Sequence, residues 1–215
     1  MSQLLKAFIA LLFTTVTTLA EPITVLALGD SLTQGYGLTP KDGFVPQLQG
    51  WLRDHDQDVQ VINAGVSGDT TAGGAARVAW SLTEDVDAVI VALGGNDILR
   101  GIPANVAKAN LDSILTQIGG LNLPVLLVGQ QATGNYGPAY RDAFNAIYPA
   151  LAQSHDTALF PDFLAGLTTR NDLNTVMAQY MQPDGLHPNA AGVLLVVEAM
   201  GPAVTRLLSQ IPQAQ

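Results

Sequence analysis

The chain of 215 residues has no cysteine, only nine lysine and arginine residues in total and only three histidines. The absence of cysteine excludes a thiol nucleophile and thiolate ligands to a metal. It does not exclude export, because a domain of this length can bury a sufficient core without disulfides, even in an oxidising compartment. Any nucleophile must therefore come from another residue type.

Positive charge is scarce, because 18 aspartate and glutamate residues oppose those nine, for a net charge of −9. Nucleic acids are bound mainly through lysine and arginine contacts to phosphate, so the composition predicts no nucleic-acid partner. It also disfavours polyanionic substrates. Charged residues make up only 13% of the chain and hydrophobic ones 48%, so we expect one folded domain with a full core.

The first twenty residues have the layout of a secretory signal peptide. Lys6 precedes an apolar stretch, Ala7 to Val16, and the small residues Thr18 and Ala20 suit the positions before a cleavage point. The apolar run is short for a bilayer span, although a retained N-terminal anchor is the alternative. We expect residues 1–20 to be removed and the mature domain, 21–215, to be periplasmic or secreted, with no stable membrane anchor.

Apolar runs alternate with helical patterns along the rest of the chain. Continuous apolar runs are typical of parallel strands that are covered on both faces. The predicted strands are Ile23–Leu28, Val59–Asn63, Ala88–Leu93, Val125–Gly129 and Ala158–Pro161, and the predicted helices are Phe44–Asp54, Thr70–Leu82, Val106–Ile118, Ala139–Ser154 and Ala190–Leu208. This alternation predicts a three-layer α/β domain with a mainly parallel sheet.

Polar, glycine-rich segments follow three of these strands, where a parallel sheet places its ligand site. They are Gly29-Asp30-Ser31, Gly65 to Thr70 and Gly94 to Asp97, and a fourth polar segment, Asp184 to Asn189, enters the last helix. Ser31 is either a nucleophile or a cap of the next helix. None of these segments has the ending of a phosphate-binding P-loop or the spacing of a dinucleotide fingerprint. Ser31 also lacks the Gly-x-Ser-x-Gly surroundings of a nucleophile elbow.

His187 follows Asp184 by three residues in a turn between two prolines. The carboxylate can accept a hydrogen bond from Nδ1 and leave Nε2 free as the base that a serine nucleophile needs. One histidine with one aspartate is too small a ligand set for zinc. The simpler alternative is a loop histidine beside a capping aspartate. His55 and His155 lie beside aspartates near helix ends, where a surface role is expected.

Attack on an acyl carbon also needs hydrogen-bond donors for the oxyanion. The backbone N–H of Ser31, the backbone of Gly68 and the side-chain amide of Asn96 are candidates. Taken singly, Gly68 and Asn96 are equally compatible with ordinary turn positions.

Together these blocks resemble the four motifs of the GDSL or SGNH hydrolase family, in the family's order. Within it the chain resembles the bacterial periplasmic thioesterase, lysophospholipase and arylesterase group, over about Ile23 to Val197. The resemblance implies a flavodoxin-like, five-stranded sheet and a hydrolase that needs no cofactor and no metal. It also implies that Ser31 is the nucleophile, His187 the base and Asp184 its partner.

The same resemblance implies an oxyanion hole of Ser31, Gly68 and Asn96 and a structural role for Asp30. It places Asn135 and Tyr136 in the loop 131–140 that lines the acyl site. We therefore expect a monomeric serine esterase for small to medium acyl esters, including aryl esters, with acyl thioesters and lysophospholipids as further substrates. The alternatives are a carbohydrate O-acetylesterase and a catalytically silent binding module.

Overall fold

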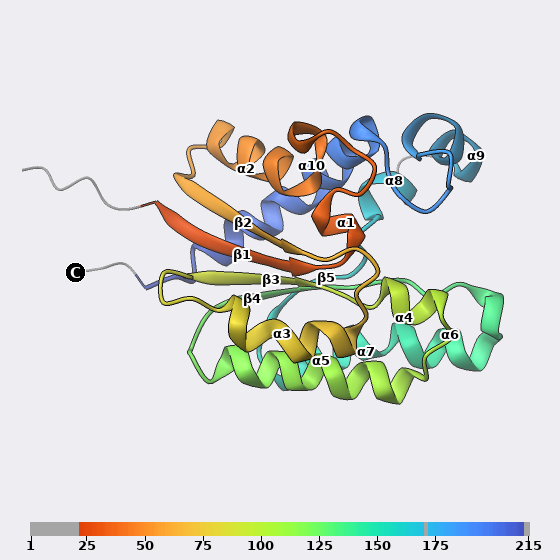
Figure 1. Ribbon diagram of the computed structural model, residues 1–215, viewed down its shortest axis with the longest axis horizontal. Helices are drawn as coiled ribbons and strands as arrows, with labels where there is room; N and C mark the ends of the chain where they lie inside the picture. The colour runs from red at the N-terminus through yellow and green to blue at the C-terminus, as the bar shows by residue number, and fades with distance from the viewer. Residues whose placement is uncertain (1–21, 170–171, 213–215) are drawn as a thin grey trace, which may run out of the picture.

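A five-stranded parallel sheet forms the centre of the molecule (Figure 1). The computed structural model describes residues 22–169 and 172–212, so the predicted signal peptide lies outside the described residues. The strands are β1 (Ile23–Gly29), β2 (Val59–Gly65), β3 (Ala88–Ala92), β4 (Val125–Val128) and β5 (Ala158–Phe160). They lie in the order β2-β1-β3-β4-β5, and every adjacent pair is parallel. The predicted three-layer α/β architecture is confirmed.

Helices cover both faces of this sheet (Figure 1). On one face lie α2 (Phe44–Asp54), α8 (Ala165–Thr168) and α10 (Ala190–Leu208), and on the other lie α3 (Thr71–Ser81), α5 (Ala104–Gly119), α6 (Pro138–Asn145) and α7 (Ile147–Ser154). Alternate residues of β1 serve the two cores: Val25 and Ala27 pack on the α2 and α10 side, and Leu26 and Leu28 on the α3 and α5 side. This double burial explains why the strands read as continuous apolar runs.

The single helix predicted over Ala139–Ser154 is wrong, because the chain forms two helices that meet at Ala146. Pro149 accounts for the break. It has no N–H to donate to the carbonyl four residues earlier, so the helical hydrogen-bond ladder cannot continue through it, and it is tolerated in the first turn of α7.

Short helical segments that the sequence analysis did not anticipate lie mostly at the carboxyl edge of the sheet. They are α1 (Ser31–Gln34), η1 (Pro40–Asp42), α4 (Gly95–Leu99), η2 (Gly134–Tyr136), α9 (Leu173–Thr175) and the π-helical η3 (Val176–Tyr180). Three of them, α1, α4 and η2, begin at or beside predicted site residues.

Helix α10 is long and apolar enough to cross a membrane by length and composition alone, with a mean hydropathy of 1.6. Most of its apolar residues, including Val196, Val197 and Met200, are buried against the sheet, whereas Leu194 is exposed. We therefore regard α10 as a core helix, whose apolarity follows from this packing.

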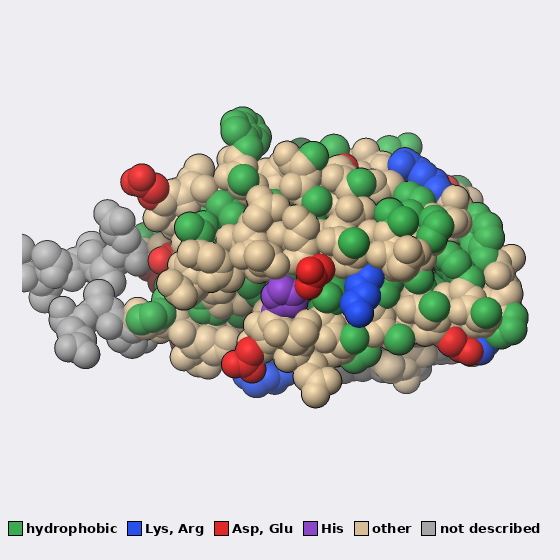
Figure 2. Space-filling view, turned by 90° about the horizontal axis from the view of Figure 1, so that it is seen from below, with side chains coloured by type: hydrophobic (Ala, Val, Ile, Leu, Met, Phe, Trp, Pro, Cys, Tyr) green, Lys and Arg blue, Asp and Glu red, His purple; other side chains and the backbone are tan. Residues whose placement is uncertain are grey.

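The face that carries α3 and α5 has few charged side chains (Figure 2). Lysine and arginine side chains stand apart from one another on it, most of them beside an acidic side chain. Among the described residues, the basic side chains of this face therefore form no continuous patch.

Candidate active site

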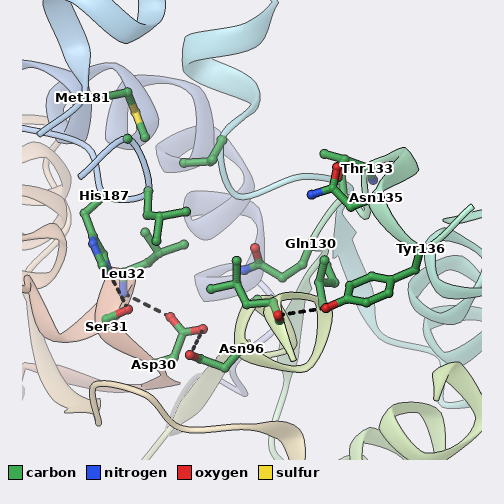
Figure 3. Close-up of a pocket in the computed structure, with 17 residues that line it drawn as sticks. Asp30, Ser31, Leu32, Asn96, Gln130, Thr133, Asn135, Tyr136, Met181 and His187 are labelled. Atoms are coloured by element: carbon green, nitrogen blue, oxygen red, sulfur yellow. Dashed lines mark hydrogen bonds between the residues drawn. The ribbon is translucent and has the colours of Figure 1, made fainter. Parts of the chain in front are cut away.

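The predicted site residues meet where the strand order reverses. Strands β1 and β3 are neighbours in the sheet, but the chain leaves them toward helices on different sides. Ser31 lies two residues after the end of β1 and Asn96 follows β3, so both lie at the carboxyl edge beside this switch point (Figure 3). Ligands bind at this place in open parallel sheets.

Ser31 is the first residue of α1, and its neighbour Asp30 is the N-cap. The Asp30 Oδ1 atom accepts a hydrogen bond from the backbone N–H of Leu32 at 3.0 Å. Gly35 ends the helix in the left-handed conformation, with φ 87°. Because Asp30 supplies the cap, the Ser31 hydroxyl is not used to hold the helix.

His187 lies in a tight turn that the Asp184 side chain stabilises by accepting hydrogen bonds from the backbone of the turn. One carboxylate oxygen, Oδ1, accepts the backbone N–H groups of Leu186 at 2.9 Å and of His187 at 3.1 Å. The other, Oδ2, lies 2.7 Å from His187 Nδ1. Gly185 has φ 68°, a conformation that favours glycine, and it lets the chain turn between the two residues. The predicted pairing of Asp184 with His187 is therefore present.

The environment of Asp184 fixes the tautomer of His187. Its hydrogen bond with the imidazole, followed by those from Leu186 and His187 N–H, lowers the pKa of Asp184 to about 2. An ionised carboxylate can only accept, so the proton between the two groups lies on Nδ1. Nε2 then carries a lone pair and accepts a hydrogen bond from the Ser31 hydroxyl, which is 2.8 Å away.

Two further residues join the serine and histidine loops. The Tyr36 ring packs on the His187 ring, with centroids 4.7 Å apart. The Gln182 amide donates to the backbone carbonyl of Tyr36 at 2.8 Å and to that of Pro188 at 3.0 Å. Sequence reasoning missed Tyr36 and Gln182, since neither has a spacing or charge that signals contact with residues about 150 positions away.

Asn96 lies in the first turn of α4 and points toward Asp30 (Figure 3). Its Nδ2 donates to Asp30 Oδ2 over a long 3.4 Å. Gly94, with φ 122°, caps α4, and a Cβ at this position would collide with the Tyr148 hydroxyl. Glycine is therefore required here to bring Asn96 to the switch point.

Asp30 is only 2% exposed, unlike Asp184. Burial raises its pKa to about 6, although the hydrogen bonds from Leu32 and Asn96 and the nearby His187 oppose the rise. The expected structural role of Asp30 agrees with its two contacts, the cap of α1 and the side chain of Asn96.

Gly68 differs from the other predicted oxyanion residues, because it does not belong to the set that lines the pocket. It is exposed, with φ 80°, and its carbonyl accepts from Arg100 Nη2 at 2.8 Å. The adjacent Ser67 hydroxyl donates to Gln34 Oε1 at 2.6 Å. The Gly68 loop is thus tied to both α1 and the end of α4.

The pocket beside Ser31 is lined by the nucleophile candidate, its base and a largely apolar wall. Asn135 and Tyr136, predicted as substrate-binding residues, both line it, and the Tyr136 hydroxyl donates to the Leu99 carbonyl at 3.1 Å. The apolar wall consists of Leu32, Ile98, Leu99, Leu164, Met181 and Leu186. Gln131 and Thr133, in the loop 131–140 that was expected to line the acyl site, also line the pocket. Gln130 lines it too and was not predicted.

Among residues 22–169 and 172–212, no cluster of three or more histidine, aspartate and glutamate side chains is placed to hold a metal ion. The arrangement around Ser31 consists of a hydroxyl, an imidazole and a carboxylate joined in one chain of hydrogen bonds, beside an apolar cavity. Such a chain can remove the hydroxyl proton and hold the resulting positive charge on the imidazole.

A parallel sheet of this order, with these groups at its switch point, defines an SGNH-type hydrolase fold. The chain belongs to the GDSL-like lipase/acylhydrolase family, whose model matches residues 27–194. It is therefore a hydrolase acting on ester bonds, and the resemblance found in the sequence is confirmed.

Three relatives are similar to this chain over most of its length. It is 39% identical to esterase TesA of Pseudomonas aeruginosa, over 95% of this chain and 98% of that protein. It is 38% identical to an arylesterase of Vibrio mimicus, over 76% and 79% of the two chains. It is 39% identical to thioesterase 1/protease 1/lysophospholipase L1 of Escherichia coli K12, over 77% of this chain and 76% of that protein.

Solved structures agree with this assignment. The crystal structure of AlinE4, an SGNH-hydrolase family esterase, is 40% identical and superposes with a TM-score of 0.71, covering 89% of this chain and 99% of AlinE4.

Proposed function

We propose that the chain is a serine esterase in which Ser31 is the nucleophile, His187 the general base and Asp184 the residue that orients and stabilises the imidazole. The observation that carries the proposal is the continuous hydrogen-bonded chain, 2.8 Å from Ser31 Oγ to Nε2 and 2.7 Å from Nδ1 to Asp184. These distances lie within the reach needed for proton transfer.

In this mechanism Ser31 Oγ attacks the acyl carbon while Nε2 takes its proton. The imidazolium then gives that proton to the departing alcohol or thiol, and the acyl group stays on Ser31 as an ester. Water attacks this acyl-enzyme with its proton passing to Nε2, and the acid leaves as the proton returns to Ser31. Asp184 stays ionised throughout and offsets the transient positive charge on His187.

The tetrahedral intermediate requires hydrogen-bond donors, and we assign these to the backbone N–H of Ser31, to Gly68 and to the Asn96 side chain. The position of Ser31 at the start of α1 supports the first assignment, because N–H groups in the first turn of a helix have no partner within it. Asn96 is supported by its long contact with Asp30, which leaves its amide able to turn toward an oxyanion. Gly68 is supported by the loop that Arg100 and Gln34 tie beside the site.

The substrates we propose are small to medium acyl esters, including aryl esters, with acyl thioesters and lysophospholipids as further candidates. The apolar wall of the pocket suits an acyl chain. The names of the relatives, which include esterase, arylesterase, thioesterase and lysophospholipase, support the same range. A panel of aryl esters, acyl thioesters, lysophospholipids and acetylated sugars would rank them, and activity confined to acetylated sugars would contradict this proposal.

We further propose that the mature enzyme comprises residues 21–215 and acts as an exported monomer. The sequence of residues 1–20 supports export. Amino-terminal sequencing of the protein recovered from a bacterial periplasm tests the cleavage, and its elution volume in gel filtration tests the monomer.

The decisive variant for the proposed reaction is Ser31→Ala. Loss of the attacking oxygen is expected to reduce the kcat for p-nitrophenyl butyrate by at least about a thousandfold. The small remaining activity would come from substrate binding alone. Ser113→Ala, on the exposed surface of α5, is the matched control and should retain full activity. A Ser31→Ala enzyme that keeps most of its activity would refute the proposal.

A further inference from the structure

Arg77, on α3, uses all three nitrogens of its guanidinium group to hold the chain near Ser31. Its Nε donates to Asp69 Oδ2 at 2.7 Å, its Nη1 to the Ala64 carbonyl at 2.9 Å and its Nη2 to the Gly29 carbonyl at 2.9 Å. The side chains of Arg77 and Asp69 are only 21% and 13% exposed. This ion pair is therefore better shielded from solvent than an ordinary surface pair, and it is weakened less by salt.

The three acceptors belong to the segments that carry Ser31 and Gly68. Gly29 is the last residue of β1, two positions before the serine. Ala64 is the last residue but one of β2, and Asp69 directly follows Gly68. The guanidinium group thus connects the strand end that leads to the nucleophile with the loop that carries a proposed oxyanion donor.

The loop after β2 depends on such side-chain contacts for its position. β2 is an edge strand of the sheet, so a neighbouring strand supports it on one side (Figure 1). Gly68 itself is exposed and has φ 80°. Arg100 fixes its carbonyl oxygen from the α4 side, and Arg77 fixes the next residue, Asp69, from the sheet side. A loop N–H that stabilises an oxyanion has to be aimed before the reaction begins, and these contacts aim it.

The Asp69 carboxylate has a fixed place between Arg77 and the first turn of α3. A Cβ at Gly73 would collide with Asp69 Oδ1, so glycine at this position makes room for the carboxylate. The start of a helix also favours a negative charge. The planar guanidinium group reaches the carboxylate and two carbonyls at once, which the single ammonium group of a lysine cannot reproduce.

We propose that Arg77 is a positioning residue for the ester hydrolysis: it fixes the Gly68 loop against the end of β1, so that the N–H groups of Gly68 and Ser31 serve the same oxyanion. Arg77 is not among the residues that line the pocket, and it acts through the loop. This inference rests on the proposed esterase function and on Gly68 as an oxyanion donor.

The first test is Arg77→Met, which keeps most of the length of the side chain but removes its charge and its donors. We expect kcat for p-nitrophenyl butyrate, corrected for the active fraction by titration, to fall by about ten- to a hundredfold, because a misplacement of about 1 Å has effects of this size. KM should stay within about twofold, since the loop contributes to the transition state and not to substrate binding.

A second measurement separates positioning from a loss of stability. An alkyl trifluoromethyl ketone adds Ser31 Oγ and places a tetrahedral oxyanion in the site, so its inhibition constant reports on the oxyanion donors directly. In Arg77→Met this constant should rise by the factor by which kcat/KM falls. A role confined to folding would lower the melting temperature but leave the constant unchanged.

The matched control is Arg53→Met, at the opposite end of β2. Arg53 donates from Nε at 3.2 Å and from Nη2 at 3.0 Å to the Val59 carbonyl, so this variant also removes guanidinium bonds to the backbone of β2. It should leave kcat and the inhibition constant unchanged. Arg77→Lys keeps the positive charge beside Asp69; it should recover part of the lost rate, and it provides the test should the methionine variant fold poorly.

If Arg77→Met and Arg77→Lys lower the melting temperature but leave kcat and the inhibition constant at their wild-type values, the inference is wrong while the esterase proposal stands. A fall in kcat without the matching rise in the inhibition constant would also overturn it, because the loss would then lie outside the oxyanion hole. If Ser31→Ala hydrolyses p-nitrophenyl butyrate at the wild-type rate, the failure lies in the proposed function.

Discussion

Two aspartates reach the Ser31 region, and their environments are opposite. Asp184 contacts His187, its side chain is 36% exposed, and three donors lower its pKa to about 2. Asp30 contacts Asn96, is 2% exposed, and burial raises its pKa to about 6. Hydrogen bonds to the charged form outweigh desolvation at Asp184, and desolvation outweighs them at Asp30.

The different environments of Asp184 and Asp30 show that the residue type alone does not determine the role of an aspartate at this site. Asp184 is kept charged, which suits a group that must stabilise an imidazolium. Asp30 is buried beneath the site, where it caps α1 and holds Asn96. We therefore expect substitutions of the two residues to differ in kind: Asp184 should govern the rate, and Asp30 should govern how stability depends on pH.

The largest effect is expected from Asp184→Asn. An amide in place of Oδ2 donates to Nδ1 instead of accepting from it, so His187 adopts the tautomer that cannot take the Ser31 proton. We expect kcat for p-nitrophenyl butyrate to fall by about 10³- to 10⁴-fold. The control is Asp112→Asn, because Asp112 also pairs with a histidine, His155, at 2.7 Å but on the surface and away from Ser31. Equal losses in the two variants would contradict the assignment.

The next largest effect is expected from Asn96→Ala, which changes the residue that contacts Asp30. Removal of one oxyanion donor should lower kcat by about 10²- to 10³-fold with little change in KM. Asn174→Ala, at an exposed position of α9, should be without effect. A loss confined to KM would show that Asn96 binds the ground state of the substrate rather than the oxyanion.

The smallest of the three effects, and the one that separates the two carboxylates most clearly, concerns stability. The folded pKa of Asp30, about 6, lies above the ordinary value of 3.8, so between these values the folded protein binds more protons than the unfolded chain. Stability should therefore fall as the pH rises through this window, by about 3 kcal/mol in total. Asp30→Asn should remove that fall.

The change of stability with pH that Asp184 causes has the opposite sign to that of Asp30. Its folded pKa of about 2 lies below 3.8, so its contribution to stability is present above about pH 4 and is lost as the pH falls toward 2. Urea unfolding of wild type, Asp30→Asn and Asp184→Asn at a series of pH values measures both slopes. Identical pH profiles for the two variants would show that the two environments do not differ as described.

The sequence predicts most of the fold, because most strands are apolar runs and three of the four polar motifs follow a strand. It also locates Ser31 and Asn96 at one edge, since parallel strands bring their carboxyl ends together. Asp184 could be paired with His187 because a separation of three residues fits within one turn.

Other features depend on contacts that have no local signal. Gln182 is an uncharged residue whose contacts with the backbone carbonyls of Tyr36 and Pro188 form only after folding. The contrast between Asp30 and Asp184 follows from burial, which residue type does not disclose. The predicted helix over 139–154 failed because its apolar periodicity outweighed the effect of Pro149 in the prediction.

The most direct test of the central claim, that Ser31, His187 and Asp184 act as one unit, is the rate at which a fluorophosphonate probe modifies the folded protein. We expect one adduct, located at Ser31 by peptide mass mapping, and labelling at least about a hundredfold slower in both His187→Ala and Asp184→Asn, since the hydroxyl is a weak nucleophile without its base. Modification at another residue, or at Ser31 with equal rates in all three proteins, would contradict the claim.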